Sequence, residues 1–280
     1  MKPTVSVCFI TYNHERFVAQ ALEGVLMQKT NFDYEIVIGE DCSTDRTREI
    51  IKDFIKKYPE KIRLLLRPQN IGAARNFVQT FSTCKGRYIA LLDGDDYWTS
   101  PYKLQKQVDF LESHPECSEC FHDVQVVSEE DKPLFISSPR RKKPRYTLKD
   151  LLKGNFIYTC SVVYRKGLMK EFPEWIYKVS IGDWPLHILN AQYGDIGYID
   201  EVMGAYRVHS GGIHSSKEEM EQVKETIEVY SYINAHLNYR YNTYIKTQMW
   251  FKLVEKKIGL FLASHGLGKI VDLYRKIFYE

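Results

Sequence analysis

The chain has no long apolar run, few cysteines and almost no net charge. None of its 280 residues lie in a stretch approaching the roughly 20 apolar residues that a membrane span needs, and Met1–Thr4 leads straight into a strand-like segment without a secretory leader. Six scattered cysteines favour reduced thiols over a disulfide framework. A formal charge of +3 gives no strong field for nucleic acid. We therefore expect a cytoplasmic protein with one large α/β domain, alone or with a smaller appendage.

Two common nucleotide-binding motifs are also missing. No G-x-G-x-x-G follows the first expected strand and G-x-x-x-x-G-K-[ST] occurs nowhere, which disfavours a dinucleotide-binding or P-loop site. Cys117 and Cys120 form one CxxC between His114 and His122, a pattern that invites a zinc interpretation. Because no second ligand pair follows at zinc-finger spacing and the segment looks like a strand, zinc is disfavoured as well.

Strand-like and helix-like segments alternate through the first hundred residues. We expect strands at Val5–Ile10, Glu35–Ile38, Ile62–Leu66 and Tyr88–Leu92, and helices at Arg16–Gln28, from Ser43 to about Tyr58, and at Ala73–Cys84. This alternation predicts βαβ units and a largely parallel sheet, and therefore an α/β fold.

Beyond Asp96 the pattern changes. We expect helices at Pro101–Ser113, Thr147–Lys153 and Gly182–Gln192, strands at Phe121–Val127, Thr159–Tyr164, Ile196–Ile199 and Met203–Val208, and a polar, basic loop from Ser128 to about Arg145. From about Lys217 the strand signals disappear and the chain is helical. One boundary is therefore expected, between a domain of residues 1–216 and a helical extension of residues 217–280.

Three carboxylates crowd into Asp93-Gly94-Asp95-Asp96, directly behind the apolar run Tyr88–Leu92. Such a run indicates a buried strand, and open α/β sheets bind their ligands at the C-terminal ends of strands. Carboxylates this close repel one another unless a cation lies among them. Hard oxygen ligands suit Mg²⁺ or Mn²⁺, ions that usually also hold a substrate phosphate. The alternative is a plain acidic turn, since Asp and Gly are common in turns.

Six short segments carry motifs in a fixed order. They are the opening strand Val5–Asn13, the turn Glu40–Asp45 with Glu40 in place of a commoner Asp, the N-x-G segment Asn70–Asn76, the D-x-D of Asp93–Asp95, the G-D element Gly182–Trp184 and the Y-R-x-H of Tyr206–His209. Together they resemble the family-2 inverting glycosyltransferases of the GT-A fold. The resemblance implies a Rossmann-like, mostly parallel sheet flanked by helices, with a nucleotide-sugar-binding half at about 1–100 and an acceptor half at about 101–216.

The resemblance also implies a chemistry, the metal-dependent transfer of a sugar from a nucleotide-diphospho-sugar to an acceptor hydroxyl. Asp95 is the implied ligand of a Mn²⁺ or Mg²⁺ cofactor, Asp93 touches the metal or the ribose, and His209 is a further candidate ligand. Asp96 could serve the metal, the donor sugar or the structure. Asp183 is implied as the general base that takes the proton of the acceptor, although Asp is also a common helix N-cap.

Residues from both halves form the nucleotide-sugar pocket that the resemblance implies. They are Thr11, Tyr12, Asn13, Glu15, Asp41, Asn70, Arg75, Asp93, Gly94 and Arg207. Asp41 is expected to accept from a uracil or thymine N3–H, which favours a UDP- or dTDP-linked donor, and the fork of N–H donors on Arg207 suits a diphosphate. Plainer roles stay open for several of them, as a turn acid, a loop former or a packing residue.

The residues after Lys217 allow two interpretations. Apolar residues recur at helical spacing with lysines between them, as in a basic amphipathic helix that contacts an anionic membrane, where lipid-linked acceptors reside. They are Ile245, Met249, Trp250, Leu253, Val254, Ile258, Phe261 and Leu262. The alternative is an apolar face packed on the catalytic domain or on a second subunit. The expected partners are thus a nucleotide-sugar donor and a saccharide or lipid-linked acceptor, with no nucleic acid.

Two other functions fit a nucleotide-binding α/β chain. A sugar nucleotidyltransferase would need a Gly-rich, basic loop after the first strand, and Thr11–Glu15 has no such character. A non-catalytic nucleotide-sugar-binding module would not need Asp93, Asp95 and Asp183 together. We therefore expect a glycosyltransferase, acting in the synthesis of bacterial surface polysaccharide or glycoconjugate.

Overall fold

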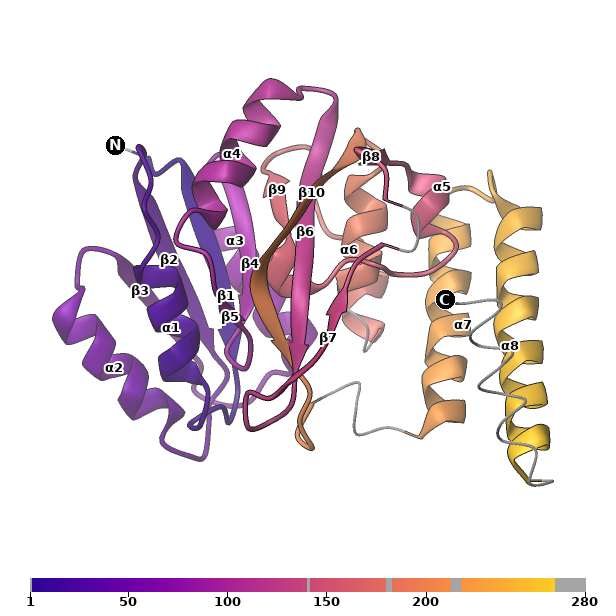
Figure 1. Ribbon diagram of the computed structural model, residues 1–280, viewed down its shortest axis with the longest axis horizontal. Coiled ribbons are helices and arrows are strands. Elements are labelled where there is room, and N and C mark those ends of the chain that lie inside the picture. Colours follow the sequence, from indigo (N-terminus) through magenta and orange to yellow (C-terminus); the bar gives the residue numbers. More distant parts are fainter. Residues whose placement is uncertain (1, 140–141, 180–182, 213–217, 265–280) are drawn as a thin grey trace.

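One mixed sheet organises the chain (Figure 1). The structure, a computed structural model, describes residues 2–139, 142–179, 183–212 and 218–264. Its strands are β1 (Val5–Thr11), β2 (Tyr34–Glu40), β3 (Ile62–Leu66), β4 (Tyr88–Asp93), β5 (Tyr97–Trp98), β6 (Cys117–Val127), β7 (Pro133–Ser137), β8 (Arg145–Tyr146), β9 (Val163–Arg165) and β10 (Asp195–Arg207). They follow the spatial order β3-β2-β1-β4-β9-β6-β10-β5, with β7 beside β6 and β8 beside β10.

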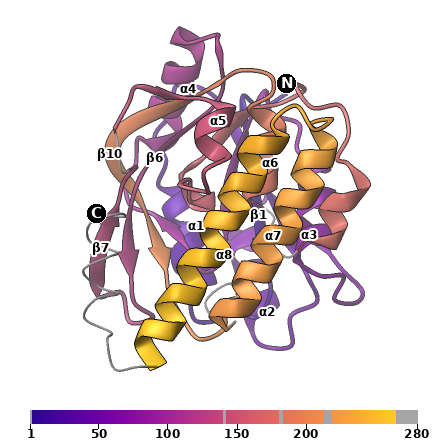
Figure 2. The same cartoon turned by 90° about the vertical axis from the view of Figure 1, so that its right-hand side faces the viewer.

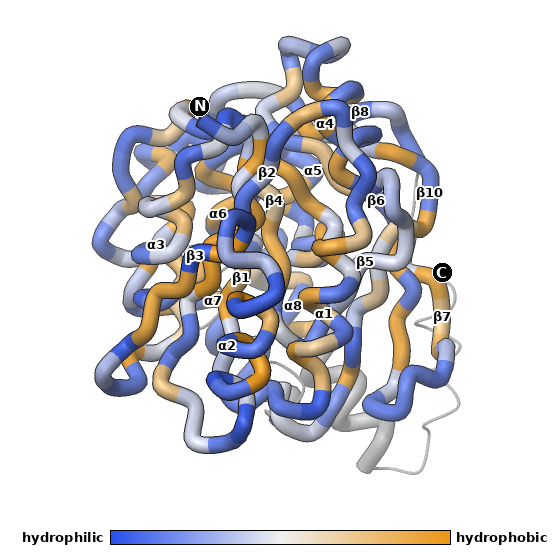
Figure 3. Tube along the Cα trace, turned by 90° about the vertical axis from the view of Figure 1, so that its left-hand side faces the viewer, coloured by the Kyte–Doolittle hydropathy of each residue, from blue (hydrophilic) through white to orange (hydrophobic). Residues whose placement is uncertain are grey.

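The N-terminal part has the parallel arrangement that the alternating pattern predicts. β1 pairs in parallel with β2 and with β4, and β2 pairs in parallel with β3. The helices that connect these strands are α1 (Val18–Leu26), α2 (Thr47–Lys57) and α3 (Ala73–Thr83). Val5, Val7 and Phe9 of β1 are fully buried, and hydrophobic colour follows β1 and β4 through the middle of Figure 3. Parallel strands are covered on both faces, so their side chains are apolar almost without interruption.

In the second half, two expected strands are one. Ile196–Ile199 and Met203–Val208 were assigned to separate strands, whereas β10 runs from Asp195 to Arg207 in parallel with β6. The register of that pairing shifts between Ile199 and Val202. Such a bulge leaves residues unpaired and bends the strand without ending it. The residues of this irregular stretch resemble a turn in the sequence, which is why two strands were expected.

Two further segments differ from expectation. The expected loop of residues 128–145 contains β7, which pairs antiparallel with β6. The expected strand Thr159–Tyr164 begins as the 3-10 turn η1 (Thr159–Ser161), so that β9 starts only at Val163. The backbone N–H and the hydroxyl of Ser161 both donate to the carbonyl of Tyr158, at 2.8 and 2.7 Å. These local hydrogen bonds compete with strand pairing and favour the turn.

Two long helices, α7 (Glu219–His236) and α8 (Asn242–Ser264), lie together at the end of the molecule opposite α2 (Figures 1 and 2). Tyr230 of α7 is fully buried, and its ring packs edge-on against Trp184 with 4.7 Å between centroids. Its hydroxyl donates to the carbonyl of Leu152 at 3.0 Å. Ile245 of α8 is buried in the same cluster. In the part that the structure describes, these helices therefore pack on the rest of the fold, as the second interpretation of this region expects.

The outer face of α8 is different. Trp250 and Phe251 are 58% and 54% exposed, on the side of the helix away from Ile245. No helix within the described ranges is both long enough and apolar enough to cross a membrane.

The remaining helical elements lie around the second half of the sheet. They are α4 (Lys103–Ser113), α5 (Leu148–Leu151), α6 (Asp183–Asn190) and the 3-10 turn η2 (Glu174–Lys178). α6 matters most for function, because its first residue is the implied general base.

Candidate active site

A cleft of about 920 Å³ opens at the C-terminal ends of β1, β2 and β4. Thr11 ends β1, Asp41 follows β2 and Asp93 ends β4, and all three line the cleft. Because these strands are parallel, their C-terminal ends meet at the same edge of the sheet, where open α/β sheets bind ligands. The volume lies in the range of small-molecule and cofactor sites.

Gly94 allows the acidic turn to approach the first strand closely. A Cβ on Gly94 would lie 2.4 Å from Thr11 Oγ1 and 2.8 Å from His14 Nδ1, closer than side chains tolerate. The N–H of Gly94 donates to the carbonyl of Ile10 at 2.9 Å. Gly94 therefore serves the site by close packing that positions the carboxylates on either side of it.

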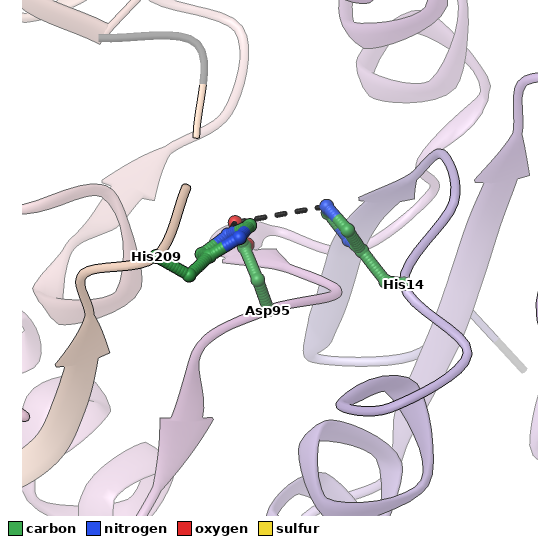
Figure 4. A group of neighbouring side chains, drawn as sticks. All are labelled: His14, Asp95 and His209. Carbon is green, nitrogen blue, oxygen red and sulfur yellow. Dashed lines mark hydrogen bonds and ion pairs between the residues drawn. The ribbon is translucent and has the colours of Figure 1, made fainter. Parts of the chain in front are cut away.

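Asp95 lies between the imidazoles of His14 and His209 (Figure 4). Its Oδ2 is 3.0 Å from His209 Nε2 and 3.6 Å from His14 Nε2. Burial raises the pKa of Asp95, but His14 and the hydrogen bond from His209 outweigh burial and hold this pKa below its usual value. Burial lowers the pKa of His14, against the opposing charge of Asp95. At neutral pH the site therefore presents an ionised carboxylate and a neutral imidazole, the forms that bind a cation.

Asp93 and Asp96 flank Asp95, and their pKa values are shifted in the opposite direction. Burial, followed by repulsion from Asp95 and Asp183, raises the pKa of Asp93 well above its usual value. Burial, followed by repulsion from Asp95 and Asp93, raises the pKa of Asp96 well above its usual value. Asp96 Oδ1 accepts the backbone N–H of Arg207 at 2.9 Å, whereas its Oδ2 has no hydrogen-bond partner among the residues described. A cation would relieve this crowding of carboxyl groups.

The donor atoms fit a divalent cation in two overlapping sets that share Asp95. One set is Asp93, Asp95 and Asp96, the other is His14, Asp95 and His209, and the ligand atoms of each set lie within 4.8 Å of one another. Carboxylates suit Mg²⁺ and Mn²⁺, and imidazole suits Mn²⁺ better than Mg²⁺. Asp93, Asp95 and His209 were all expected here. The sequence did not single out His14, because no motif marks it and only the fold of its loop brings it to Asp95.

Asp183 begins α6 and lines the same cleft. Its Oδ1 accepts the backbone N–H of Trp184 at 2.7 Å, and its Oδ2 accepts from Asn155 Nδ2 at 3.1 Å and from Thr159 Oγ1 at 3.5 Å. Its charge contributes to the raised pKa of Asp93, so the two carboxylates act on one another. One oxygen of Asp183 therefore serves the start of the helix, and the other lies among cleft-lining side chains, so the expected role of general base stays a prediction that this position allows.

The loop after β1 braces the loop after β2. Asn13 Oδ1 accepts from the backbone N–H of Thr44 at 2.8 Å and from its hydroxyl at 3.3 Å. Glu15 Oε2 accepts another backbone N–H of that loop at 2.9 Å. Thr11 and Tyr12 line the cleft. Thr11 and Tyr12 therefore lie at the cleft, whereas Asn13 and Glu15 hold the two loops together beside it, and their expected contacts with a nucleotide-sugar stay predictions.

Asp41 and Asn70 meet at the rim of the cleft that both residues line. Asp41 Oδ1 accepts the N–H of Ile71 and its Oδ2 accepts the N–H of Gly72, each at 2.9 Å. Asn70 Oδ1 also accepts the N–H of Gly72, at 3.0 Å. Each carboxylate oxygen keeps the capacity for a further donor, so the expected contact with a base N–H stays open to Asp41.

The two expected arginines lie differently from the expectation. Arg75 is exposed on α3, and the residues that line the cleft do not include it. Arg207 is 2% exposed, and its N–H groups have protein acceptors. These are the carbonyls of Asp95 (3.0 Å), Ser128 (3.5 Å) and Glu129 (3.1 Å) and the side-chain oxygens of Gln20 (2.7 Å) and Asp131 (2.8 Å). A guanidinium has five N–H donors, so Arg207 holds the Asp95 turn in place and has no free fork for a diphosphate.

Comparisons with known proteins agree with this geometry. Residues 6–172, more than half of the chain, match the family described as Glycosyl transferase family 2, and the chain belongs to that family. An uncharacterized protein of Mycobacterium tuberculosis is 40% identical over 79% of this chain, which spans only 64% of that relative. A protein of Bacillus subtilis that carries the name putative teichuronic acid biosynthesis glycosyltransferase TuaG is 29% identical over 92% of this chain and 98% of its own length.

Solved structures show the same fold. S. aureus TarS residues 1–349, in complex with UDP-GlcNAc, superimposes with a TM-score of 0.64 at 21% identity, over 82% of this chain and 66% of that chain. The mannosyltransferase PcManGT of Pyrobaculum calidifontis, in complex with GDP-Man and Mn²⁺, gives 0.62 at 14% identity, over 99% and 83%. The expected GT-A fold is therefore confirmed.

Proposed function

We propose that this glycosyltransferase is inverting and metal-dependent, and that it moves a sugar from a UDP- or dTDP-linked donor to an acceptor hydroxyl. The observation that carries the proposal is the meeting of Asp93, Asp95 and Asp183 in one cleft at the strand ends. Such a displacement needs carboxylates that hold the cation and a further carboxylate that takes the proton of the acceptor hydroxyl. Asp93 and Asp95 suit the first role, and Asp183 on α6 suits the second.

Asp95, together with Asp93 and the two histidines His14 and His209, would hold the Mn²⁺ or Mg²⁺ ion. When bound, such an ion stabilises the negative charge that develops on the leaving diphosphate. The chain itself keeps the ligands in place. Arg207 Nε donates to the carbonyl of Asp95 at 3.0 Å, and the backbone N–H of Arg207 donates to the carboxylate of Asp96. Fixed ligands of this kind need little reorganisation when the donor binds.

Asp183 is the general base of the proposed reaction. Its Oδ1 is fixed by the N–H of Trp184, and its Oδ2 is held by Asn155 and Thr159, so the carboxylate has a defined orientation in the cleft. The reacting sugar carbon becomes oxocarbenium-like, and inversion requires the acceptor hydroxyl to attack from the face opposite the leaving group. A carboxylate on that face takes the proton as the new bond forms.

Asp41 supports a uridine or thymidine donor. Two backbone N–H groups fix its carboxylate beside the cleft, where it can accept the N3–H of a pyrimidine. TarS was solved with a UDP-sugar and PcManGT with a GDP-sugar, so the fold takes both kinds of base. In this chain we propose that Asp41 selects the pyrimidine.

The proposed pathway is the synthesis of a bacterial surface polysaccharide or glycoconjugate, on a saccharide or lipid-linked acceptor. The name of TuaG supports the polysaccharide. The exposed Trp250 and Phe251 of α8 support peripheral contact with the inner face of the membrane, with a homodimer through the same helices as the alternative.

A thermal-shift screen of nucleotide-sugars with and without Mn²⁺ tests the proposed function. A ligand at 100 times its Kd stabilises the native state by about 2.7 kcal/mol. We expect a UDP- or dTDP-sugar to raise Tm only when Mn²⁺ is present. Equal stabilisation without the metal would refute the metal dependence, and stabilisation by GDP-sugars alone would refute the assignment of the base.

A further inference from the structure

One cation in the cleft has no part in the proposed reaction. Lys252 of α8 lines the cleft together with the acidic cluster around Asp95. Arg207, the other strong base of the lining, is already bound to protein acceptors. Across the described part of the chain, no carboxylate lies within ion-pair distance of Lys252 Nζ. Lys252 is therefore a cation available to a ligand.

Lys252 lies at the end of the cleft where Asp183 stands. A Cβ built on Gly154 would be 3.6 Å from Lys252 Nζ and 3.9 Å from its Cε, so the ammonium group lies against Gly154. The next residue, Asn155, donates to Asp183 Oδ2 at 3.1 Å. The rim of the cleft that Asp41 and its partners form lies elsewhere, at the ends of the N-terminal strands. The lysine thus lies against the segment that holds the proposed base, away from the rim that Asp41 and its partners form.

The helix fixes this orientation. Ile245, Met249 and Lys252 follow one another at spacings of four and three residues, which places them on one face of α8. Ile245 is fully buried and Met249 packs on the same core cluster. Lys246 and Trp250 are on the outer face and are exposed. The face that packs on the core cluster therefore carries Lys252 inward.

Gly154 has a φ of +150°, a conformation that side chains rarely adopt, so a larger residue at this position would strain the backbone. The distance from its Cβ position to Lys252 is ordinary van der Waals contact, so the backbone conformation and not the lysine favours glycine here.

We propose that Lys252 binds a negatively charged group of the acceptor, a carboxylate or a phosphate ester close to the hydroxyl that receives the sugar. The inference rests on the proposed function and adds a substrate class to it. A neutral acceptor needs no cation at this position. An anionic acceptor entering a cleft rich in carboxylates is repelled unless a positive charge meets it, and a charge-assisted hydrogen bond from an ammonium group supplies that attraction.

The test is the binding of three small fragments to the full chain saturated with UDP and Mg²⁺, measured by ligand-observed NMR. The fragments are methyl glucoside, methyl glucuronide and glucose 6-phosphate. We expect at least one anionic fragment to bind about 10-fold or more tightly than methyl glucoside, since hydrogen bonds to charged groups are strong. The tighter of the two anionic fragments identifies a carboxylate or a phosphate as the preferred group.

Variants of α8 complete the test. Lys252→Met should remove the preference for the anionic fragment, Lys252→Arg should keep most of it, and Lys246→Met, on the exposed face of the same helix, should change nothing. Equal melting temperatures show that the fold is intact. Equal binding of the three fragments by the parent overturns the proposal, as does a preference that survives in Lys252→Met.

Two further measurements separate this inference from the proposed function. If Lys252→Met weakens UDP itself about 10-fold, the lysine serves the donor diphosphate and the acceptor assignment is wrong. Metal-dependent cleavage of UDP-sugars and dTDP-sugars without any acceptor tests the enzyme alone. Absence of that cleavage refutes the proposed function, whereas cleavage without an anion preference refutes only the role of Lys252.

Discussion

Replacing Asp183 with Asn should slow sugar transfer by about 10²–10⁴-fold while donor affinity stays nearly unchanged. Asn keeps the size of the side chain and an acceptor oxygen for the N–H of Trp184, which now lies 2.7 Å from Oδ1. It cannot take the proton of the acceptor hydroxyl. The loss corresponds to about 3–5 kcal/mol of transition-state stabilisation, at 1.36 kcal/mol for each factor of ten.

The same change should cost much less in stability. The new amide would face Asn155 Nδ2 and Thr159 Oγ1, which donate to Oδ2 of Asp183 at 3.1 and 3.5 Å. Thr159 can rotate its hydroxyl and accept, whereas Asn155 is held because its Oδ1 accepts the N–H of Ile157 at 3.1 Å. One lost hydrogen bond costs about 1 kcal/mol, and in a chain of this size we expect Tm to fall by roughly 2–4 °C.

The assay is the transfer rate with saturating donor and acceptor, beside a donor titration on the same preparation. Asn155→Ala is the matched control, because it removes the same hydrogen bond and leaves the carboxylate of Asp183 in place. We expect it to lose less than about 10-fold in rate, since it removes an orienting contact and not the base. Turnover of Asp183→Asn within a few-fold of the parent would refute the role of Asp183, and lost donor binding would assign it to the nucleotide-sugar pocket.

Three other predictions follow from the cleft and the core. Asp95→Ala should abolish metal-dependent donor binding in calorimetry with the fold intact, and parental affinity for donor and Mn²⁺ would show that the metal assignment is wrong. Calorimetry should also show UDP or dTDP binding more tightly than GDP, and the reverse order would remove Asp41 as the reader of the base. Burial lowers the pKa of Lys103 from 10.5 to about 7, so the unfolded chain keeps this proton up to about pH 10.5 and the folded chain releases it near pH 7. Its cost to stability therefore shrinks as the pH rises from 7 to 10.5, and Lys103→Met should raise the free energy of unfolding in urea at pH 7 more than at pH 10. A variant less stable than the parent at pH 7 would contradict this sign.

The acidic end of the site could be predicted because it depends on local pattern. The apolar run of β4 predicts a buried strand, and the residue after such a strand must lie at the edge of the sheet, as Asp93 does. Thr11 and Asp41 follow from the same argument applied to β1 and β2. Position at a strand end is thus set by a few consecutive residues, and a sequence shows it directly.

The contacts of Arg207 and His14 could not be predicted in the same way. The acceptors that occupy the guanidinium of Arg207 come from residues 20, 95 and 128–131, which only the folded chain brings together. His14 reaches Asp95 because Gly94 lets two loops approach, and neither residue signals that distance by its type. Lys252 likewise looked like one of several lysines on a basic helix, until the packing of Ile245 fixed which face of α8 points inward.

The most direct test of the central claim is the release of UDP from UDP-sugars by the purified chain, followed with Mn²⁺, with EDTA and after the metal is restored. We predict release that stops in EDTA, returns with Mn²⁺ or Mg²⁺, and falls by at least about 10²-fold in Asp95→Ala, because an ion bound there stabilises the leaving diphosphate. Release that continues unchanged in EDTA, or that is equal in the parent and in Asp95→Ala, would contradict it.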